Sequence, residues 1–203
     1  VVEECARAGA SLVGGDLSSS EHIALGVTAL GNLSGRPAVT RAGARAGDQV
    51  AVCGRLGCSA GGLLVLQRGF GSPKDLVLEQ QCPTVPYGQG KVAAEAGATA
   101  MIDVSDGLLQ DLGHICELSG VGIDVRTGAL KIHDSLARLA AATGKDPLGF
   151  VLAGGEDHAL AATFPAEVEL PQGWLRIGTV TAGAEVIVDG MPWTGSVGWD
   201  HFA

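Results

Sequence analysis

The sequence predicts an α+β fold. Helical and strand-like segments are mixed along the chain, and the last strand-like segments follow one another without a helix between them. Strands joined directly in this way return antiparallel, whereas a doubly wound parallel sheet needs a helical crossover between strands. Apolar residues make up 46% of the 203 residues, which is a normal fraction for a packed core. We therefore expect helices packed on a sheet with antiparallel returns.

A domain boundary is expected near residues 36–37. The chain begins with what looks like the end of a helix, and apolar segments at residues 11–13 and 22–33 predict two strands. We interpret residues 1–36 as the truncated end of a preceding ATP- and metal-binding domain, and residues 37–203 as a C-terminal α+β domain. Because the sequence has no Met start, we expect it to be the C-terminal portion of a longer protein.

The elements of the second domain follow from apolar periodicity and from helix start and stop signals. The predicted strands are residues 49–53, 98–104, 122–125, 150–153, 159–164, 176–180 and 185–188. The predicted helices are residues 59–68, 88–96, a segment from residue 108 that closes at Gly120, and residues 134–142. Residues 69–86 are predicted to form a loop-rich connection.

The helix that starts near residue 108 has a clear pattern. Its apolar residues recur on one face at helical spacing: Leu108, Leu109, Leu112, Ile115 and Cys116. Ser105 or Asp106 is expected to cap its N-terminus. Together with Asp103, these residues bring two carboxylates and a hydroxyl to the connection between a strand end and a helix start.

Three acidic motifs each follow a strand-like segment: GGD at residues 14–16, DVSDGL at 103–108 and GGED at 154–157. Paired glycines permit a close backbone approach, and carboxylates are the hard oxygen ligands that Mg²⁺ prefers. The helix N-terminus after the second motif favours an anion such as phosphate. Each motif alone is also an ordinary turn or cap. Their recurrence in one chain predicts magnesium chemistry on a phosphate compound.

Charge and composition argue against several other classes. The net charge is −9 with only 13 Lys and Arg residues, so we expect no nucleic-acid partner. The apolar stretches are too short to span a bilayer, and we expect no membrane partner. Five cysteines without a CxxC pair indicate a reduced, cytoplasmic protein. The sequence contains neither a Walker-type phosphate loop nor a Rossmann fingerprint.

Residues 57–61 fit the GxSxG pattern of a serine hydrolase, with Ser59 in the place of the nucleophile. The surrounding segment also has the expected order of strand, turn and helix. A triad needs in addition an acid and a histidine, and the downstream histidines are His114, His133, His158 and His201. Because such a short motif often matches by chance, a serine hydrolase is the less favoured interpretation.

The motifs GGD, TRAGARAGD, IDVSDGL, GGED and GWDHF, in this order, resemble those of the thiamine-monophosphate kinase family. That family belongs to the superfamily of aminoimidazole ribonucleotide synthetase and selenophosphate synthetase. The resemblance extends from Gly14 to Phe202, and SDGL is its most discriminating part. Two departures are Cys58, where the family often has Asp, and His158, where Tyr is more usual. The family also has a substantial N-terminal part before the point where this chain begins.

The resemblance implies a fold and an activity. The fold is the C-terminal α/β sandwich domain of the aminoimidazole ribonucleotide synthetase-like fold, plus the tail of the N-terminal domain. The activity is ATP-dependent phosphorylation of thiamine monophosphate to thiamine diphosphate by direct, Mg²⁺-assisted transfer, in a full-length homodimer. Two alternatives stay open: a sister-superfamily ATP-dependent synthetase acting on another small substrate, or an inactive fragment of the kinase.

The resemblance also implies site residues. Those expected to contact ATP are Gly15, Asp16, Arg41 and Ser105. Those expected to bind Mg²⁺ are Asp16, Asp103 and Asp106. Those expected in the thiamine-phosphate pocket are Glu156 and Trp199, a carboxylate and an aromatic face that suit a cationic thiazolium. No catalytic base is expected, because the acceptor phosphate is already an anionic nucleophile at neutral pH.

Overall fold

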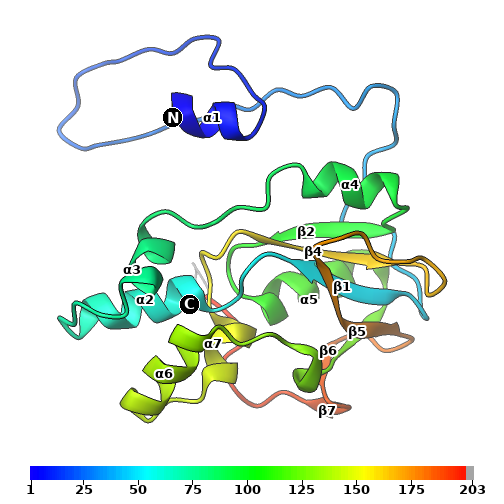
Figure 1. Ribbon diagram of the computed structural model, residues 1–203. Coiled ribbons are helices and arrows are strands. Elements are labelled where there is room, and N and C mark those ends of the chain that lie inside the picture. Colours follow the sequence, from blue (N-terminus) through cyan, green and yellow to red (C-terminus); the bar gives the residue numbers. More distant parts are fainter. Residues whose placement is uncertain (200–203) are drawn as a thin grey trace. The chain divides into compact units, whose positions relative to one another are not determined.

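The computed structural model describes residues 1–199. The chain divides into two units, Val1–Ala38 and Val39–Ala203, each taken here by itself (Figure 1). The first unit begins with helix α1 (Val2–Arg7). This helix confirms the expected helix end at the start of the chain.

The rest of the first unit, residues 8–38, is fully described and contains neither a helix nor a strand. The predicted strands at residues 11–13 and 22–33 are therefore wrong. Apolar side chains in the second of these segments, among them Ile23 and Val27, are exposed. A strand needs a neighbour that takes up its backbone N–H and C=O groups, and an apolar pattern alone does not supply one. The assignment of residues 1–36 to a preceding domain stays a prediction.

Within residues 39–199, a seven-stranded sheet has the order β2-β4-β1-β5-β3-β6-β7. Its strands are β1 (Gln49–Cys53), β2 (Ala100–Val104), β3 (Gly122–Val125), β4 (Ala159–Phe164), β5 (Trp174–Thr181), β6 (Val186–Val188) and β7 (Met191–Pro192). Neighbouring strands are antiparallel except β3 and β6, which are parallel. The α+β fold class is thus confirmed.

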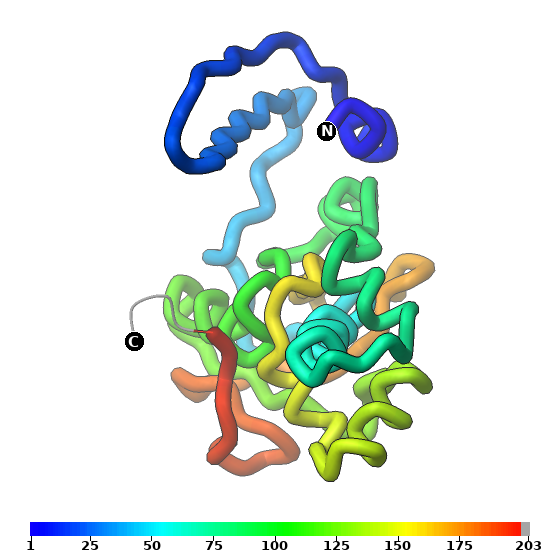
Figure 2. The backbone as a smooth tube through the Cα atoms, turned by 90° about the vertical axis from the view of Figure 1, so that its left-hand side faces the viewer, coloured from blue at the N-terminus to red at the C-terminus, as the bar shows by residue number. Residues whose placement is uncertain are grey.

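The helices of this unit are α2 (Cys58–Gln67), α3 (Lys74–Gln81), α4 (Gln89–Glu95), α5 (Leu108–Ser119), α6 (Asp134–Thr143) and α7 (Pro147–Ala153), with a 3-10 turn η1 at Thr127–Ala129. Figure 2 shows the orange-to-red C-terminal segment running beside the green segment that contains α5. No helix in the described part of the chain is long and apolar enough to cross a membrane.

In the second unit, two further element predictions are wrong. Residues 150–153 belong to helix α7 and not to a strand, because Asp146 accepts a hydrogen bond from the Leu148 N–H at 2.9 Å and Pro147 occupies the first helical position. Helix α3 lies inside the predicted connection at residues 69–86. Its start has the helix-favouring arrangement of Pro73 followed by an acidic residue in the first turn.

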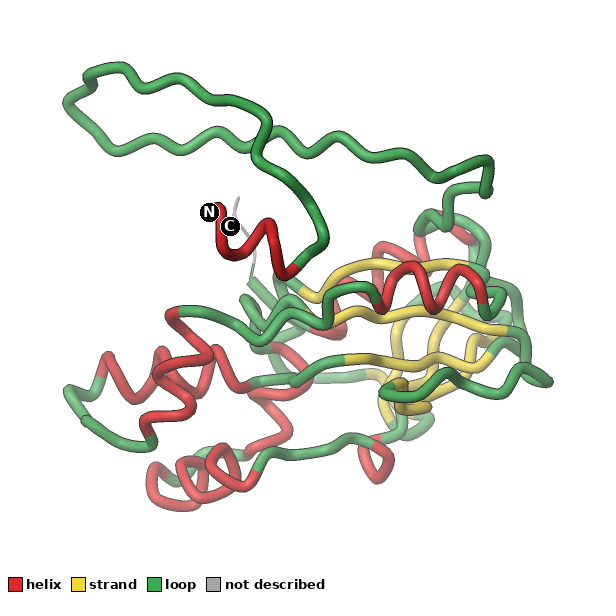
Figure 3. Tube along the Cα trace, turned by 45° about the horizontal axis from the view of Figure 1, so that its top comes forward, coloured by secondary structure: helices red, strands yellow, loops and turns green. Residues whose placement is uncertain are grey.

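The sheet has a core on each face. Val50 and Val52 of β1 pack in the larger core, which also contains buried residues of α2, α5, α6 and α7. Ala51 and Cys53 face the other way, toward a smaller core that includes α4. Figure 3 shows the strands gathered toward one end of this unit and helices α2, α3, α6 and α7 toward the other. The connections from β2 to α5 and from α7 to β4 lie where the sheet meets these helices.

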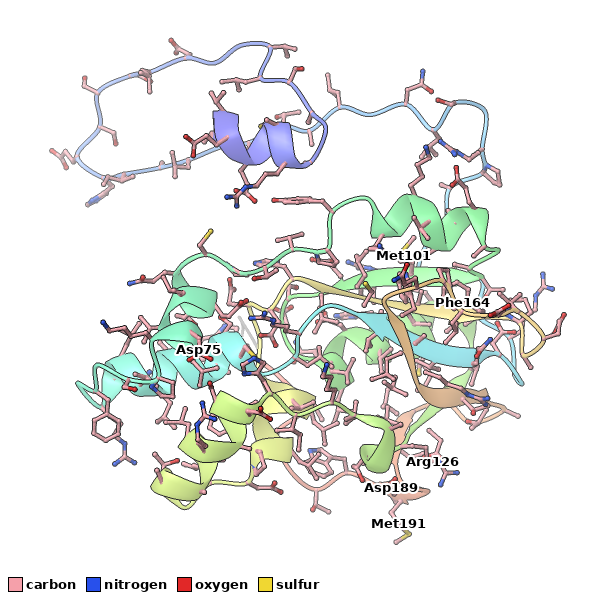
Figure 4. The ribbon with its side chains drawn as sticks, in the orientation of Figure 1. Asp75, Met101, Arg126, Phe164, Asp189 and Met191 are labelled. Atoms are coloured by element: carbon pink, nitrogen blue, oxygen red, sulfur yellow. The ribbon has the colours of Figure 1, made fainter. Side chains whose placement is uncertain are left out.

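The smaller core contains a pair of aromatic side chains. Phe164 of β4 and Trp174 of β5 meet edge to face, with ring centroids 5.5 Å apart. Met101 of β2 packs against the same cluster, and Figure 4 shows Met101 and Phe164 in the part of the sheet beneath α4. This face therefore holds β2 in place, which fixes the position of the loop that follows it, residues 105–107, here called the SDG loop.

Candidate functional site

The loop between β2 and α5, residues 105–107, is shaped by a buried carboxylate. Asp111, which is 2% exposed, lies one turn inside α5. One of its oxygens, Oδ2, accepts hydrogen bonds from the backbone N–H groups of Ser105, Asp106 and Gly107, at 2.9, 3.1 and 3.2 Å. Burial raises the pKa of the Asp111 carboxyl, while these N–H groups act in the opposite direction.

The prediction that Ser105 or Asp106 caps α5 is therefore wrong. The cap residue is Gly107, which makes no side-chain cap bond, and Asp111 binds the N–H groups instead. A Cβ atom on Gly107 would lie 2.9 Å from the Ala153 carbonyl oxygen, so α7 comes too close for another residue type here. The predicted helix end is confirmed, because Gly120 closes α5 in the left-handed conformation with φ of 66°.

A second loop, residues 154–158, connects α7 to β4 and lies against the first. The Glu156 N–H donates to the Ser105 carbonyl oxygen at 2.7 Å, and the His158 N–H donates to the Val104 carbonyl oxygen at 3.0 Å. A Cβ atom on Gly155 would lie 2.6 Å from the Ser105 carbonyl oxygen. This position therefore needs glycine, because the GGED backbone lies directly on the SDG backbone.

The C-terminal segment completes the site. The Trp199 N–H donates to the Asp106 carbonyl oxygen at 2.8 Å, and the Gln110 side-chain amide donates to the Trp199 carbonyl oxygen at 2.7 Å. The backbone of Trp199 is thus fixed at both polar groups, while its side chain remains 64% exposed. An aromatic face is held in this way beside the SDG loop.

These three segments, together with α2 and α3, line a pocket of about 270 Å³. Its lining residues are Ala60, Leu63, Gln80, Ser105, Asp106, Gly155, Glu156 and Trp199. Four of the residues predicted from the sequence are therefore brought together here: Ser105, Asp106, Glu156 and Trp199. The Glu156 carboxylate lies 3.6 Å from Nε2 of His158. The pocket combines an apolar wall with carboxylates and an aromatic ring, as a small organic cation with a polar end requires.

A larger cavity of about 390 Å³ lies next to this pocket and shares Ala60 and Leu63 with it. Its other lining residues come from α2 and from the start of α7, and they include Lys145 and Asp146. It contains none of the residues that the sequence motifs single out. We therefore place the candidate site in the smaller pocket.

The remaining predicted residues lie elsewhere. Asp103 is exposed on β2 and does not line the pocket. The Arg41 carbonyl oxygen accepts from the hydroxyl of Ser119, the last residue of α5. A 12-residue helix is about 18 Å long, so Arg41 is tied to the end of α5 opposite Ser105. Gly15 and Asp16 are exposed residues of the first unit. The roles of these four residues stay predictions.

The predicted Mg²⁺ residues supply some, but not all, of the oxygen ligands that a divalent cation needs. Asp103, near the end of β2, and Asp106, in the loop that follows, offer the hard oxygen atoms that Mg²⁺ prefers, with waters and phosphate oxygens as the usual remaining ligands. In the described part of the chain, no group of three or more His, Cys, Asp or Glu side chains is arranged to hold a metal ion. These residues are thus consistent with a site that the substrates complete.

The serine hydrolase interpretation is not supported by the structure. Ser59 is 1% exposed, and its hydroxyl donates to Oε1 of Gln80 at 2.8 Å. A nucleophilic serine has to reach a substrate and needs a histidine as its partner. His201 lies outside the described residues.

Sequence reasoning missed the residues that support the site. Asp111 carried a signal, since it is an acidic residue among the apolar positions of α5, namely Leu108, Leu109, Leu112, Ile115 and Cys116. Ala60, Leu63 and Gln80 carried none, because α2 and α3 come to the site only through tertiary packing.

Comparison with known proteins identifies the family of the chain. A family model described as "AIR synthase related protein, C-terminal domain" matches residues 45–190. The chain belongs to this family. The AIR synthase related family was the superfamily expected from the motif order, so that resemblance is confirmed.

Among the curated relatives of the chain are several thiamine-monophosphate kinases. The chain is 50% identical over 202 residues to the one from Mycobacterium tuberculosis, covering 98% of this chain and 60% of that protein. It is 39% identical over 203 residues to the one from Corynebacterium glutamicum, covering 95% of this chain and 60% of that protein. The chain thus spans about 60% of the length of these relatives.

Solved structures give the same result. The chain is similar to a structure described as "AaThiL complexed with AMPPCP and TMP", with a TM-score of 0.75 and 36% identity over 81% of this chain and 54% of that one. It is also similar to the thiamine-monophosphate kinase of Stenotrophomonas maltophilia, with a TM-score of 0.69 and 33% identity over 76% of this chain and 54% of that one. The hydrogenase maturation protein HypE of Escherichia coli, at 21% identity and a TM-score of 0.59, shares the fold.

Proposed function

We propose that the complete protein containing this chain phosphorylates thiamine monophosphate to thiamine diphosphate, with ATP as the phosphoryl donor. The observation that carries the proposal is the pocket in which Ser105, Asp106, Glu156 and Trp199 meet. The names of the curated relatives support the same substrate, and so does the neighbouring structure described with AMPPCP and TMP.

The reaction makes one bond and breaks one. An oxygen of the acceptor phosphate bonds to the γ-phosphorus of ATP, and the bond between that phosphorus and the β–γ bridging oxygen breaks, so that ADP leaves with the electron pair. Transfer of this kind needs positioning and charge neutralisation more than covalent help. The acceptor oxygen is already ionised at neutral pH, and no side chain of the chain is assigned as a base.

The residues around the SDG loop would bind the phosphate groups. The hydroxyl of Ser105 would donate to a phosphate oxygen. Arg41 and Gly15, which do not belong to the SDG loop, are proposed as further ATP contacts from the family resemblance, with the planar fork of Arg41 suited to bidentate binding. Asp16, Asp103 and Asp106 would hold Mg²⁺. Bound Mg²⁺ supplies neutralisation of the negative charge on the phosphate groups.

The thiamine part would lie between the carboxylate of Glu156 and the ring of Trp199. A thiazolium carries a permanent positive charge, which a carboxylate and an aromatic face both attract. Ala60 and Leu63 on α2 supply the apolar wall against which the rings pack. Cytoplasmic location and a homodimer are part of the same proposal, since they follow from the family resemblance.

The test is product formation by the complete protein. Thiamine monophosphate, ATP and Mg²⁺ are supplied at saturating concentrations, and the product is separated by chromatography and detected as its fluorescent thiochrome derivative. Accumulation of thiamine diphosphate with one ADP released per product supports the proposal. ADP release that depends on another small substrate instead would identify a sister-superfamily synthetase, and no turnover of either kind would identify an inactive protein.

A further inference from the structure

A buried carboxylate lies beneath the proposed substrate pocket and is not used in the mechanism above. Asp157, in the GGED loop, is 5% exposed. Its Oδ2 accepts a hydrogen bond from the Gly57 N–H, and its Oδ1 accepts one from the Ser59 N–H at 2.9 Å. These donors belong to the first turn of α2, a ten-residue helix that starts at Cys58. Asp157 therefore caps a helix from 100 residues away in the sequence.

The charge of Asp157 is compensated by this helix start. Within residues 1–199, no Lys, Arg or His side chain forms an ion pair with it. Burial raises the pKa of Asp157, and the negative charge of Glu79 adds to this effect. The ionised form of Asp157 is therefore stabilised by its two N–H donors and by the positive end of the α2 dipole.

The two residues beside Asp157 have an uncommon backbone conformation. Glu156 has φ of 64° and His158 has φ of 51°, both in the left-handed region that residues with a Cβ atom rarely adopt. The buried Asp157 lies between them. Such a conformation persists only where the surrounding contacts enforce it. Here the contacts are the bonds of Asp157 to α2 and those of the Glu156 and His158 N–H groups to β2 and the SDG loop.

The same helix that Asp157 caps supplies the apolar wall of the pocket. Ala60 directly follows Ser59, one of the two N–H donors to Asp157, and Leu63 lies one helical turn after Ser59. Glu156, the residue before Asp157, lines the same pocket. One buried carboxylate thus joins the two sides of the pocket.

We propose that Asp157 is a positioning residue that acts through Glu156: by fastening the GGED loop to the first turn of α2, it holds the Glu156 carboxylate at the distance from Ala60 and Leu63 that the thiamine rings require. This inference rests on the proposed function, because it takes Glu156 as a contact of the thiamine part. Asp157 itself does not touch the substrate.

A double-mutant cycle in the complete protein tests the proposal. The variants are E156Q, D157N and the double variant, assayed above neutral pH with thiamine monophosphate and ATP varied separately. Asn in place of Asp157 keeps one acceptor but turns an NH₂ group toward the second backbone N–H. We expect D157N to raise KM for thiamine monophosphate about tenfold, the equivalent of one charge-assisted hydrogen bond, with KM for ATP changed less than about twofold. Added to E156Q, D157N should change KM by less than about twofold, because the two residues act as one unit.

The matched control is D146N. Asp146 also caps a helix, accepting from the Leu148 N–H at 2.9 Å, but it is exposed and does not line the pocket. Since Asn caps a helix about as well as Asp, this variant should behave like the parent. If D157N fails to fold, D157E takes its place, because it keeps both acceptors and moves the loop by one methylene.

The outcomes separate the two claims. Additive effects of the two substitutions, or an equal rise in KM for both substrates, would overturn the positioning role while leaving Glu156 as a substrate contact. No effect of E156Q on KM for thiamine monophosphate would refute the contact itself, and the inference with it. A loss of thermal stability in D157N with KM unchanged would show that Asp157 is only a structural cap.

Discussion

Asp111 allows a quantitative test of how the SDG loop is held. Its three hydrogen bonds from Ser105, Asp106 and Gly107 all end on the same oxygen, Oδ2. Asn in its place can present one carbonyl oxygen to all three N–H groups and loses only the charge. Ala removes the acceptor altogether. The two substitutions therefore separate the contribution of the charge from that of the acceptor.

The expected sizes follow from this geometry. Each bond to a charged acceptor is worth about 1.5–3 kcal/mol, and the three do not add fully because they share one oxygen. We expect D111A to destabilise the loop by about 3–5 kcal/mol, the usual result of removing one partner of a buried charged group. For D111N we expect about 1 kcal/mol or less, because the charged form already carries a desolvation penalty that the amide avoids.

Amide hydrogen exchange measured by mass spectrometry on a peptide covering residues 104–112 reports this loop directly. Protection of that peptide should fall by about two to three orders of magnitude in D111A and by less than about tenfold in D111N. Peptides from β5 should exchange as in the parent in both variants. Equal exchange in D111N and D111A would refute the idea that the acceptor, and not the charge, organises the loop.

Three further predictions follow from the same geometry. D106N should keep the thermal stability of the parent, since the Asp106 side chain is not the cap of α5, yet lose most activity at limiting Mg²⁺; turnover equal to that of the parent would exclude Asp106 as a ligand. G155A should lower kcat/KM at least about tenfold, because a Cβ atom there would lie 2.6 Å from the Ser105 carbonyl oxygen. The control is G113A, where a Cβ atom would meet nothing within 4 Å. This variant should be as active as the parent and up to about 1 kcal/mol more stable in urea unfolding. Burial raises the pKa of Asp157 to about 7, above its value of about 3.9 in an unfolded chain, so the native state binds this proton more tightly. The stability from this group is then complete below about pH 4 and is lost as the pH rises through about 7, so the free energy of unfolding of the parent should fall across that range relative to D157N; parallel curves would contradict the assignment.

Much of the second unit could be predicted from the sequence. Strand β1 and helix α5 match their predicted positions because an apolar run or an apolar stripe was bounded by clear signals, such as Gly120. Helix α7 was predicted as a strand because a short apolar run fits the periodicity of a buried strand and of a buried helix equally well. The Asp146-Pro147 pair, which marks a helix start, was not used in that prediction. Residues 22–33 have the composition of a strand, but residues 1–38 contain no strand with which they could pair.

The site was predictable only in part, for physical reasons. Ser105, Asp106, Glu156 and Trp199 could be named individually from motifs, but their meeting depends on backbone hydrogen bonds between loops far apart in the sequence. The capping of α5 was assigned to the wrong residue because a carboxylate one turn inside the helix reaches back to the same N–H groups. Asp111 and Asp157, two of the buried carboxylates, show their importance only once their burial and their hydrogen-bond donors are known.

The proposed function requires thiamine monophosphate to bind in the pocket between the SDG loop, the GGED loop and Trp199. A crystal structure of the complete protein with thiamine monophosphate and a non-hydrolysable ATP analogue tests this binding site most directly. We predict the thiamine rings between Trp199 and Glu156, against Ala60 and Leu63, with the phosphate toward Ser105 and Asp106. Thiamine monophosphate bound in the larger cavity beside Lys145, or away from Trp199 and Glu156, would contradict the proposed substrate site.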